Sequence, residues 1–164
     1  MDQIEKPDLI VAFGFSKHGG ANENIATIAS YNSIVCSVPV FTQLDIAHEM
    51  TRPGMAWPVA CAYEGNGYLS TLGFCKQVKD FSDHRNLTTV QVVAAPMHRW
   101  RCVRDLKRVG LRVIEPPDKV VISPENEWYY SRDPQVWVRN GFFWWMRESC
   151  IRILPWFLYS RIAG

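Results

Sequence analysis

The chain has 164 residues, of which 48% are hydrophobic and 21% charged, and its formal net charge is +2. This length and composition indicate one globular domain over residues 1–164, with enough apolar residues for a sizeable core. The small net charge argues against a nucleic-acid-binding protein. A polar N-terminus and the lack of an apolar run of about 20 residues argue against a signal peptide and a transmembrane segment. Five scattered cysteines indicate free thiols, so we expect a cytoplasmic protein.

Apolar, β-branched runs predict strands, and apolar residues three and four apart predict the helices between them. The first expected elements are a strand at 8–13, a helix at 23–30 capped by Asn22, a strand at 33–41, a short helix at 44–50 and a strand at 59–63. They are followed by a helix at 72–81, a strand at 90–95, a helix between Pro96 and Gly110, and strands at 112–114 and 120–122. Strands alternating with helices predict an α/β fold. We expect a three-layer Rossmann-like open sheet, mostly parallel, with helices on both faces.

The C-terminal part of the chain is predicted to be an aromatic helix. Asp133 is a candidate cap with Pro134 at the first helical position, the placement that proline favours. The helix is expected to continue to Leu154, because Pro155 lacks the backbone N–H group and must break or kink it.

Two interpretations of this aromatic helix remain open. Apolar residues at helical spacing are typical of a helix that covers a core, and those residues are Phe142, Trp145, Met146 and Ile153. Alternatively, the aromatic residues around and beyond Pro155 dock onto a partner, because amphipathic aromatic side chains collect at interfaces. In that case residues 142–162 would form a homodimer interface or a peripheral membrane contact.

The stretch from Val90 to Leu111 carries the clearest candidate site. A buried strand runs directly into a helix whose first turns contain His98 and Arg101, one turn apart on the same face. Ligands bind at the carboxyl ends of strands in open parallel sheets, and a helix N-terminus there favours an anion. The positive helix end should lower the pKa of His98 and keep it neutral, as a base or hydrogen-bond donor. The competing interpretation is that these residues belong to a solvated basic helix face.

A second junction of the same type follows the first strand. Gly14 closes that strand, and the loop after it offers Ser16, Lys17 and His18. The loop matches neither a dinucleotide-binding GxGxxG pattern nor a P-loop. Two interpretations of this loop remain open: its glycines serve only the turn, or its side chains line the same site as His98. In the short helix after residue 43, Asp45 lies three positions before His48, but Glu49 is adjacent to His48 and faces away from it, so we expect no metal site there.

The run Ala94-Ala95-Pro96-Met97-His98-Arg99-Trp100-Arg101, which closes a strand and opens a helix ending in Gly-Leu, resembles the last core motif of the SanA/YdcF-like family of bacterial proteins. Weaker similarity extends over residues 8–145. Glu64, followed by Ser70 and Thr71, resembles the family's Glu and Ser/Thr segment, and the run 144–148 resembles its C-terminal helix. The resemblance implies a Rossmann-like fold and a nucleotide-like ligand.

We therefore expect a SanA/YdcF-like protein that binds a phosphate-bearing or nucleotide-like anion at the carboxyl ends of its strands. His98 and Glu64 are the candidate catalytic pair, with His98 as acid or base and Glu64 orienting it. The candidate ligand-binding residues are Gly14, Ser16, Lys17, His18, Asn24, Gln43, Ser70, Thr71 and Arg101. If there is catalysis, hydrolysis or transfer at a phosphate suits these residues, although no nucleophile or cofactor can be named. The alternative is a non-catalytic sensing or interaction module that docks through its aromatic C-terminal segment.

Overall fold

The computed structural model describes residues 5–16, 20–55, 60–64, 69–114 and 128–163. It shows an α/β fold around a five-stranded, all-parallel sheet with the strand order β3-β2-β1-β4-β5. The strands are β1 (Leu9–Ala12), β2 (Val40–Thr42), β3 (Ala60–Cys61), β4 (Thr89–Val93) and β5 (Arg112–Ile114). The predicted fold class is confirmed. The strand predicted at 120–122 lies outside the described residues.

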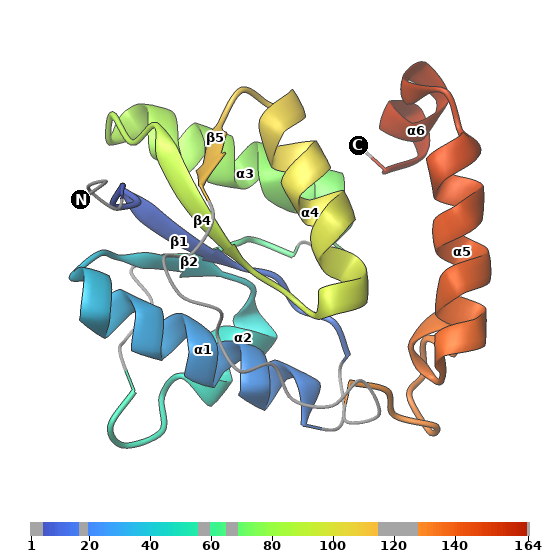
Figure 1. Ribbon diagram of the computed structural model, residues 1–164, viewed down its shortest axis with the longest axis horizontal. Helices are drawn as coiled ribbons and strands as arrows, with labels where there is room; N and C mark the ends of the chain where they lie inside the picture. The colour runs from blue at the N-terminus through green and yellow to red at the C-terminus, as the bar shows by residue number, and fades with distance from the viewer. Residues whose placement is uncertain (1–4, 17–19, 56–59, 65–68, 115–127, 164) are drawn as a thin grey trace.

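Helices cover both faces of the sheet. Figure 1 shows α1 (Ala21–Cys36) and α2 (Leu44–Glu49) on one face, and α3 (Thr71–His84) and α4 (Pro96–Arg108) on the other. The final helices, α5 (Gly141–Ile153) and α6 (Trp156–Ala163), stand beside α4 at the edge of the molecule. Within the part of the chain that the structure describes, none of these helices is both long and apolar enough to cross a bilayer.

The alternation of side chains along β1 divides the core in two. Leu9 and Val11 belong to the apolar cluster beneath α3 and α4, whereas Ile10 and Ala12 belong to the cluster on the α1 side. This is the period of two expected for a strand with helices on both faces. All residues of β1 and β4 are buried, which explains why these two strands were predicted from their apolar runs.

The register of the central strands brings three chain segments to one edge of the sheet. Ala12 of β1 is level with Thr42 of β2 on one side and Val93 of β4 on the other. The strand order also reverses direction between β1 and β4. In open α/β sheets the crevice at such a reversal is the usual ligand-binding position. The residues that follow Ala12, Thr42 and Val93 therefore meet where a ligand is expected.

The strand predicted at 33–41 is wrong over its first half. Helix α1 continues through Cys36 and ends at Ser37, whose φ of 51° lies in the left-handed region. The β-branched residues that suggested a strand are exposed on the helix surface, with Ile34 and Val35 each 60% accessible. The helix is stabilised instead by Ile25, Ala26 and Ala29, which pack on the sheet. Strand β2 then occupies only Val40–Thr42.

Asn22 does not cap α1, because the helix begins one residue before it, at Ala21. Ser70 caps α3, since its hydroxyl accepts a hydrogen bond from the N–H of Gly73 at 2.9 Å. Such a cap satisfies a backbone donor that the first helical turn leaves unpaired.

The C-terminal segment begins differently from the prediction. Asp133 is not a helix cap; it accepts a hydrogen bond from the N–H of Gln135 and precedes a single 3-10 turn, η2 (Val136–Val138). The N-cap of α5 is Asn140, whose side chain accepts from the N–H of Phe143. The predicted break at Pro155 is confirmed, because α5 ends at Ile153 and α6 begins at Trp156.

The interpretation of α5 as a helix that buries Phe142, Trp145, Met146 and Ile153 is wrong. These side chains are 65%, 68%, 47% and 82% exposed, respectively. The buried residues of α5 are Trp144 and Glu148, one turn apart on the opposite face. The helix turns this mixed face toward α4 and leaves its apolar stripe uncovered by the described residues.

Candidate functional site

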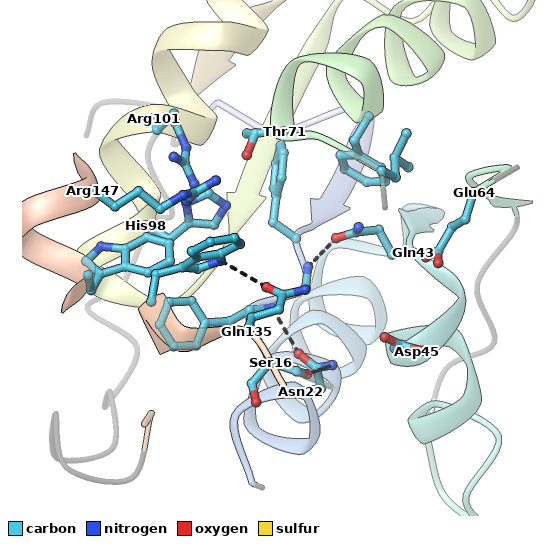
Figure 2. Close-up of a pocket in the computed structure, with 17 residues that line it drawn as sticks. Ser16, Asn22, Gln43, Asp45, Glu64, Thr71, His98, Arg101, Gln135 and Arg147 are labelled. Carbon is cyan, nitrogen blue, oxygen red and sulfur yellow. Dashed lines mark hydrogen bonds between the residues drawn. The ribbon is translucent and has the colours of Figure 1, made fainter. Parts of the chain in front are cut away.

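A pocket of about 70 Å³ lies at the carboxyl ends of β1, β2 and β4. It brings together most of the predicted site residues: Gly14, Ser16, Gln43, Glu64, Thr71, His98 and Arg101. Figure 2 shows side chains from the loop after β1, from α2, α4 and α5, and from the segment around η2 converging on it. The pocket is smaller than the ~300–1,000 Å³ typical of sites that enclose a drug-sized ligand. It suits one small polar group, with the rest of a ligand outside.

Four predicted ligand-binding residues are not part of this pocket as described. Asn24 does not line it, because Asn24 lies further along α1 while Asn22 takes the position at the rim. Ser70 lines a second, neighbouring cavity. Lys17 and His18 lie outside the described residues.

The loop after β1 is held by side chains rather than left open for an anion. The N–H of Gly14 donates to Gln43 Oε1 at 2.6 Å, and the N–H of Phe15 donates to Asn22 Oδ1 at 3.0 Å. Ser16 Oγ in turn donates to Asp133 Oδ2 at 2.5 Å. A Cβ at position 14 would come within 2.9 Å of Gln43 Oε1, so a larger residue would displace the end of this side chain from its hydrogen bond. Because the N–H groups of Gly14 and Phe15 are already paired, recognition of an anion here depends on side chains.

His98 is buried in the first turn of α4, among aromatic rings. Its ring centroid lies 5.3 Å from that of Trp144 and 6.3 Å from that of Phe13. Arg101 Nη2 lies 3.1 Å from His98 Nδ1. Because a guanidinium can only donate, Nδ1 is the acceptor, and this hydrogen bond assigns the ring proton to Nε2.

Burial lowers the pKa of His98 well below its usual value, and the nearby positive charges of Arg101 and Arg147 lower it further. The imidazole is therefore neutral at pH 7, as predicted from the sequence. The causes of the lowered pKa are burial and the two arginines, whereas the prediction relied on the helix dipole. A neutral ring with a proton on Nε2 can donate a hydrogen bond to a ligand oxygen without adding charge.

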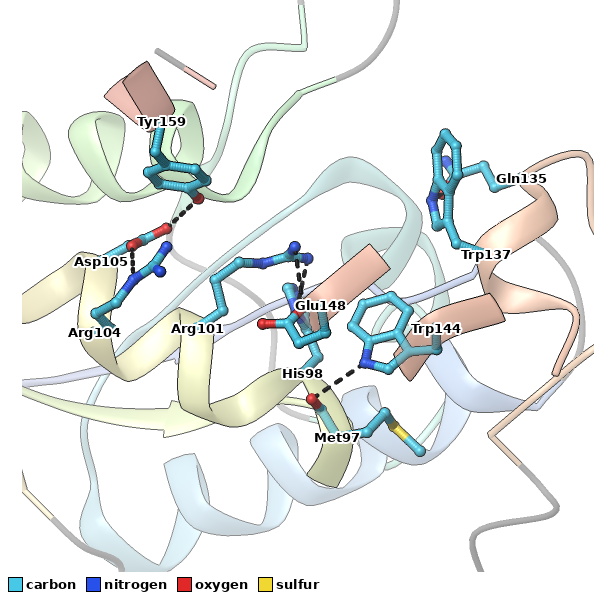
Figure 3. A network of polar contacts seen from close by, with 10 residues as sticks. All are labelled: Met97, His98, Arg101, Arg104, Asp105, Gln135, Trp137, Trp144, Glu148 and Tyr159. Atoms are coloured by element: carbon cyan, nitrogen blue, oxygen red, sulfur yellow. Dashed lines mark hydrogen bonds and ion pairs between the residues drawn. The ribbon is translucent and has the colours of Figure 1, made fainter. Parts of the chain in front are cut away.

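Arg101 forms a buried ion pair with a residue that the sequence did not suggest. Its Nη1 lies 3.2 Å from Glu148 Oε2, and the two side chains are only 3% and 5% exposed. Figure 3 shows this pair bridging α4 and α5, with His98 beside it. Trp144 completes the contact. The Arg101 guanidinium lies 5.4 Å from the Trp144 ring centroid, and Trp144 Nε1 donates a hydrogen bond to the Met97 carbonyl. Glu148 thus neutralises much of the Arg101 charge.

Charges of opposite sign occupy opposite walls of the pocket (Figure 2). On the α4–α5 wall, Arg147 joins Arg101, and its guanidinium lies 5.0 Å from the ring centroid of Trp137. Asp45 and Glu64 lie on the other side. Glu64 therefore faces His98 across the pocket, while the group that bonds to His98 is Arg101. Such a pocket can hold an anion on one side and hydroxyl or amine donors on the other.

Sequence reasoning missed Asp45, Arg147 and Glu148 as neighbours of the site. Asp45 was considered only as a metal ligand. Arg147 and Glu148 were considered as part of the run 144–148, for its resemblance to a C-terminal helix. The signal available was their spacing from Trp144: residues three and four positions apart share a helix face. A charged pair on the face of an aromatic residue is therefore a candidate for a buried polar contact.

The lowered pKa of His98 predicts a pH-dependent stability. Below about pH 6.5, the usual pKa of an unfolded histidine, the unfolded chain takes up a proton at residue 98 that the folded chain does not. The free energy of unfolding should then fall with decreasing pH by up to ~1.4 kcal/mol per pH unit from this residue alone. Urea unfolding across this pH range should show a shallower pH dependence in His98→Gln. The exposed His84→Gln is the matched control and should keep the wild-type slope; equal slopes in all three proteins would contradict the expectation.

Comparisons of the chain with protein-family models, with curated proteins and with solved structures gave no significant match.

Proposed function

We propose that this protein binds a small phosphate-bearing or nucleotide-like molecule in the pocket at the reversal of strand order between β1 and β4. The observation that carries the proposal is the meeting of His98, Arg101 and Arg147 at the carboxyl ends of the central strands, opposite Asp45 and Glu64. Membership in the SanA/YdcF-like family is part of the proposal and rests on the resemblance of residues 94–101.

The residues have distinct roles in this proposal. Arg147, half-buried at the rim, supplies the planar charged fork that suits a phosphate or carboxylate group. His98 donates from Nε2 to an oxygen of the same anion. Arg101 contributes mainly by fixing the orientation of His98, because Glu148 already balances its charge. Asp45 and Glu64 accept hydrogen bonds from hydroxyl or amine groups of the ligand, as carboxylates do from the hydroxyls of a ribose.

Binding is the core of the proposal, and catalysis would extend it. Hydrolysis or transfer at the bound phosphate would use Arg147 to stabilise developing negative charge. A histidine with a strongly lowered pKa is a weak proton acceptor, so His98 suits hydrogen-bond donation to the anion better than storage of a proton. Glu64, on the other wall, is the better placed base for a hydroxyl or water between the two walls.

Isothermal titration with inorganic phosphate and AMP tests the proposal. Both should bind to the wild type, and Arg147→Gln should weaken binding at least about tenfold, the effect of losing one charge-assisted hydrogen bond. Arg152→Gln is a matched control on the same helix. Its guanidinium also lies over a tryptophan, 4.5 Å from the ring centroid of Trp100, but it does not line the pocket. Absence of binding by either probe, or equal loss in both variants, would refute the proposal.

A second candidate function, peripheral attachment to a lipid surface, is favoured by the outer face of α5. Its exposed stripe of Phe142, Met146 and Ile153 is flanked by Trp145. The only acidic residue of α5 and α6 is Glu148, which is buried against Arg101, so the exposed charges of these two helices are arginines. This pattern suits an anionic membrane interface, whereas it would repel a second copy of itself.

Cosedimentation with vesicles tests this second candidate. The protein should bind vesicles that contain phosphatidylserine more strongly than vesicles of phosphatidylcholine alone, and Ile153→Glu should reduce that binding. Val35→Glu, at another exposed apolar position, on α1, is the control and should bind as the wild type does. Concentration-dependent dimerisation lost in Ile153→Glu, without vesicle binding, would contradict the lipid surface in favour of self-association.

A further inference from the structure

A second cavity, of about 280 Å³, opens between the start of α3 and the two C-terminal helices. Most of its wall is apolar, and the aliphatic side chains in it are Ile151, Leu154, Ile162 and Ala163. Two of the polar groups at its edge are already engaged. Ser70 Oγ bonds to the Ala163 carbonyl and to the N–H of Gly73, and Tyr159 donates its hydroxyl proton to Asp105 Oδ2 at 2.6 Å.

This cavity adjoins the charged pocket. Thr71, Arg101 and Arg147 line both spaces. The two arginines thus stand at the boundary, with the polar pocket on one side and the aliphatic cavity on the other. A ligand that placed its anionic group against Arg147 would therefore adjoin both spaces.

We propose that the ligand is an amphiphile, a phosphate monoester whose aliphatic chain lies in the second cavity. This inference rests on the proposed function, because it assigns the head group to the same arginines. The chemistry of the walls selects an alkyl chain over a nucleobase. Two of the hydrogen-bonding groups in the lining, Ser70 Oγ and the Tyr159 hydroxyl, are already engaged, and a buried polar base edge left unpaired is costly. Aliphatic walls gain free energy from each methylene that they remove from water.

A series of alkyl phosphates tests the inference. Titrations with inorganic phosphate and with butyl, hexyl and octyl phosphate, below micelle-forming concentrations, should show Kd falling by about two- to fourfold for each added methylene. Octanol, which has the chain without the charge, should bind far more weakly than octyl phosphate. That difference is the evidence that one ligand uses both spaces.

Substitutions at two neighbouring positions distinguish the contribution of the second cavity from that of the outer face of α5. In Leu154→Ser, the Kd should no longer depend on the length of the alkyl chain. Its affinity for inorganic phosphate should be unchanged, and this retained binding also shows that the variant is folded. Ile153→Ser is the matched control, since Ile153 is 82% exposed on the outer face, and it should retain both. A single Kd along the series, with inorganic phosphate still bound, would overturn the amphiphile and leave the proposed function standing. Octanol binding as tight as octyl phosphate would likewise overturn it, and no binding of any phosphate would instead refute the proposed function.

Discussion

Glu148→Leu should lower the free energy of unfolding by about 3–5 kcal/mol, because it leaves the Arg101 guanidinium buried without its carboxylate. Arg101→Met should cost about as much, by stranding Glu148. Both side chains are at most 5% exposed, so water cannot replace the missing partner. Urea unfolding at neutral pH measures the effect.

The double variant Arg101→Met/Glu148→Leu distinguishes a buried charge from a damaged helix contact. Arg101 Nε and Glu148 Oε1 are buried and have no hydrogen-bond partner among the described residues, so the native pair is only partly satisfied. Replacement of both members by apolar residues should therefore recover most of the lost stability. Arg52→Met, which breaks exposed ion pairs with Glu23 and Glu49, is the control and should cost less than about 1 kcal/mol. A double variant as unstable as the sum of the singles would show that the pair is not the cause.

Trp144→Ala should destabilise the protein by about 3–5 kcal/mol, the cost of emptying a large buried aromatic site. Trp144 is 5% exposed, meets the His98 ring edge to face and the Arg101 guanidinium over its own ring, and donates a hydrogen bond to the Met97 carbonyl. The same substitution at the next position, Trp145→Ala, is the matched control. Trp145 is 68% exposed, and surface replacements of this kind usually change stability by less than about 0.5 kcal/mol.

Chemical denaturation followed by circular dichroism compares the two tryptophan variants without relying on tryptophan fluorescence. A large loss for Trp144→Ala and a small one for Trp145→Ala would establish which face of α5 packs on the protein. The reverse order would contradict the orientation of α5 described here. It would favour instead the sequence-based interpretation, in which Trp145 belongs to the core.

The sequence was most informative where a strand is buried on both sides. The apolar runs at 8–13 and 90–95 indicated central strands of a sheet with helices on both faces. The helix that follows Pro96 has a clear apolar face. The same reasoning failed at Ser33–Phe41, because β-branched residues on an exposed helix face look like a strand when local pattern is the only guide. Helix α1 extends into that run because Ala26 and Ala29 pack on the sheet, a tertiary contact that local pattern does not reveal.

The candidate site was predicted in part for the same reason. His98, Arg101 and Gly14 follow central strands, and the topology of a parallel sheet places such residues together. Arg147 and Glu148 come from a helix whose most prominent local signal, its apolar periodicity, favoured the wrong face. The inner face of α5 is set by one tryptophan and a charge pair with α4, which becomes visible only when both helices are placed.

Trp144 and Met97, whose contact joins α5 to α4, are 47 positions apart in the chain. Ribosomal synthesis delivers β1, β4 and α4 first, so a nascent chain can hold His98 and Arg101 in place while Trp144, Arg147 and Glu148 are still to emerge. Until they do, Arg101 has no buried carboxylate beside it, and the pocket lacks its second cationic residue. Ligand capture therefore becomes available only after α5 has been synthesised, because one wall of the pocket is built from a helix that follows the sheet in the chain.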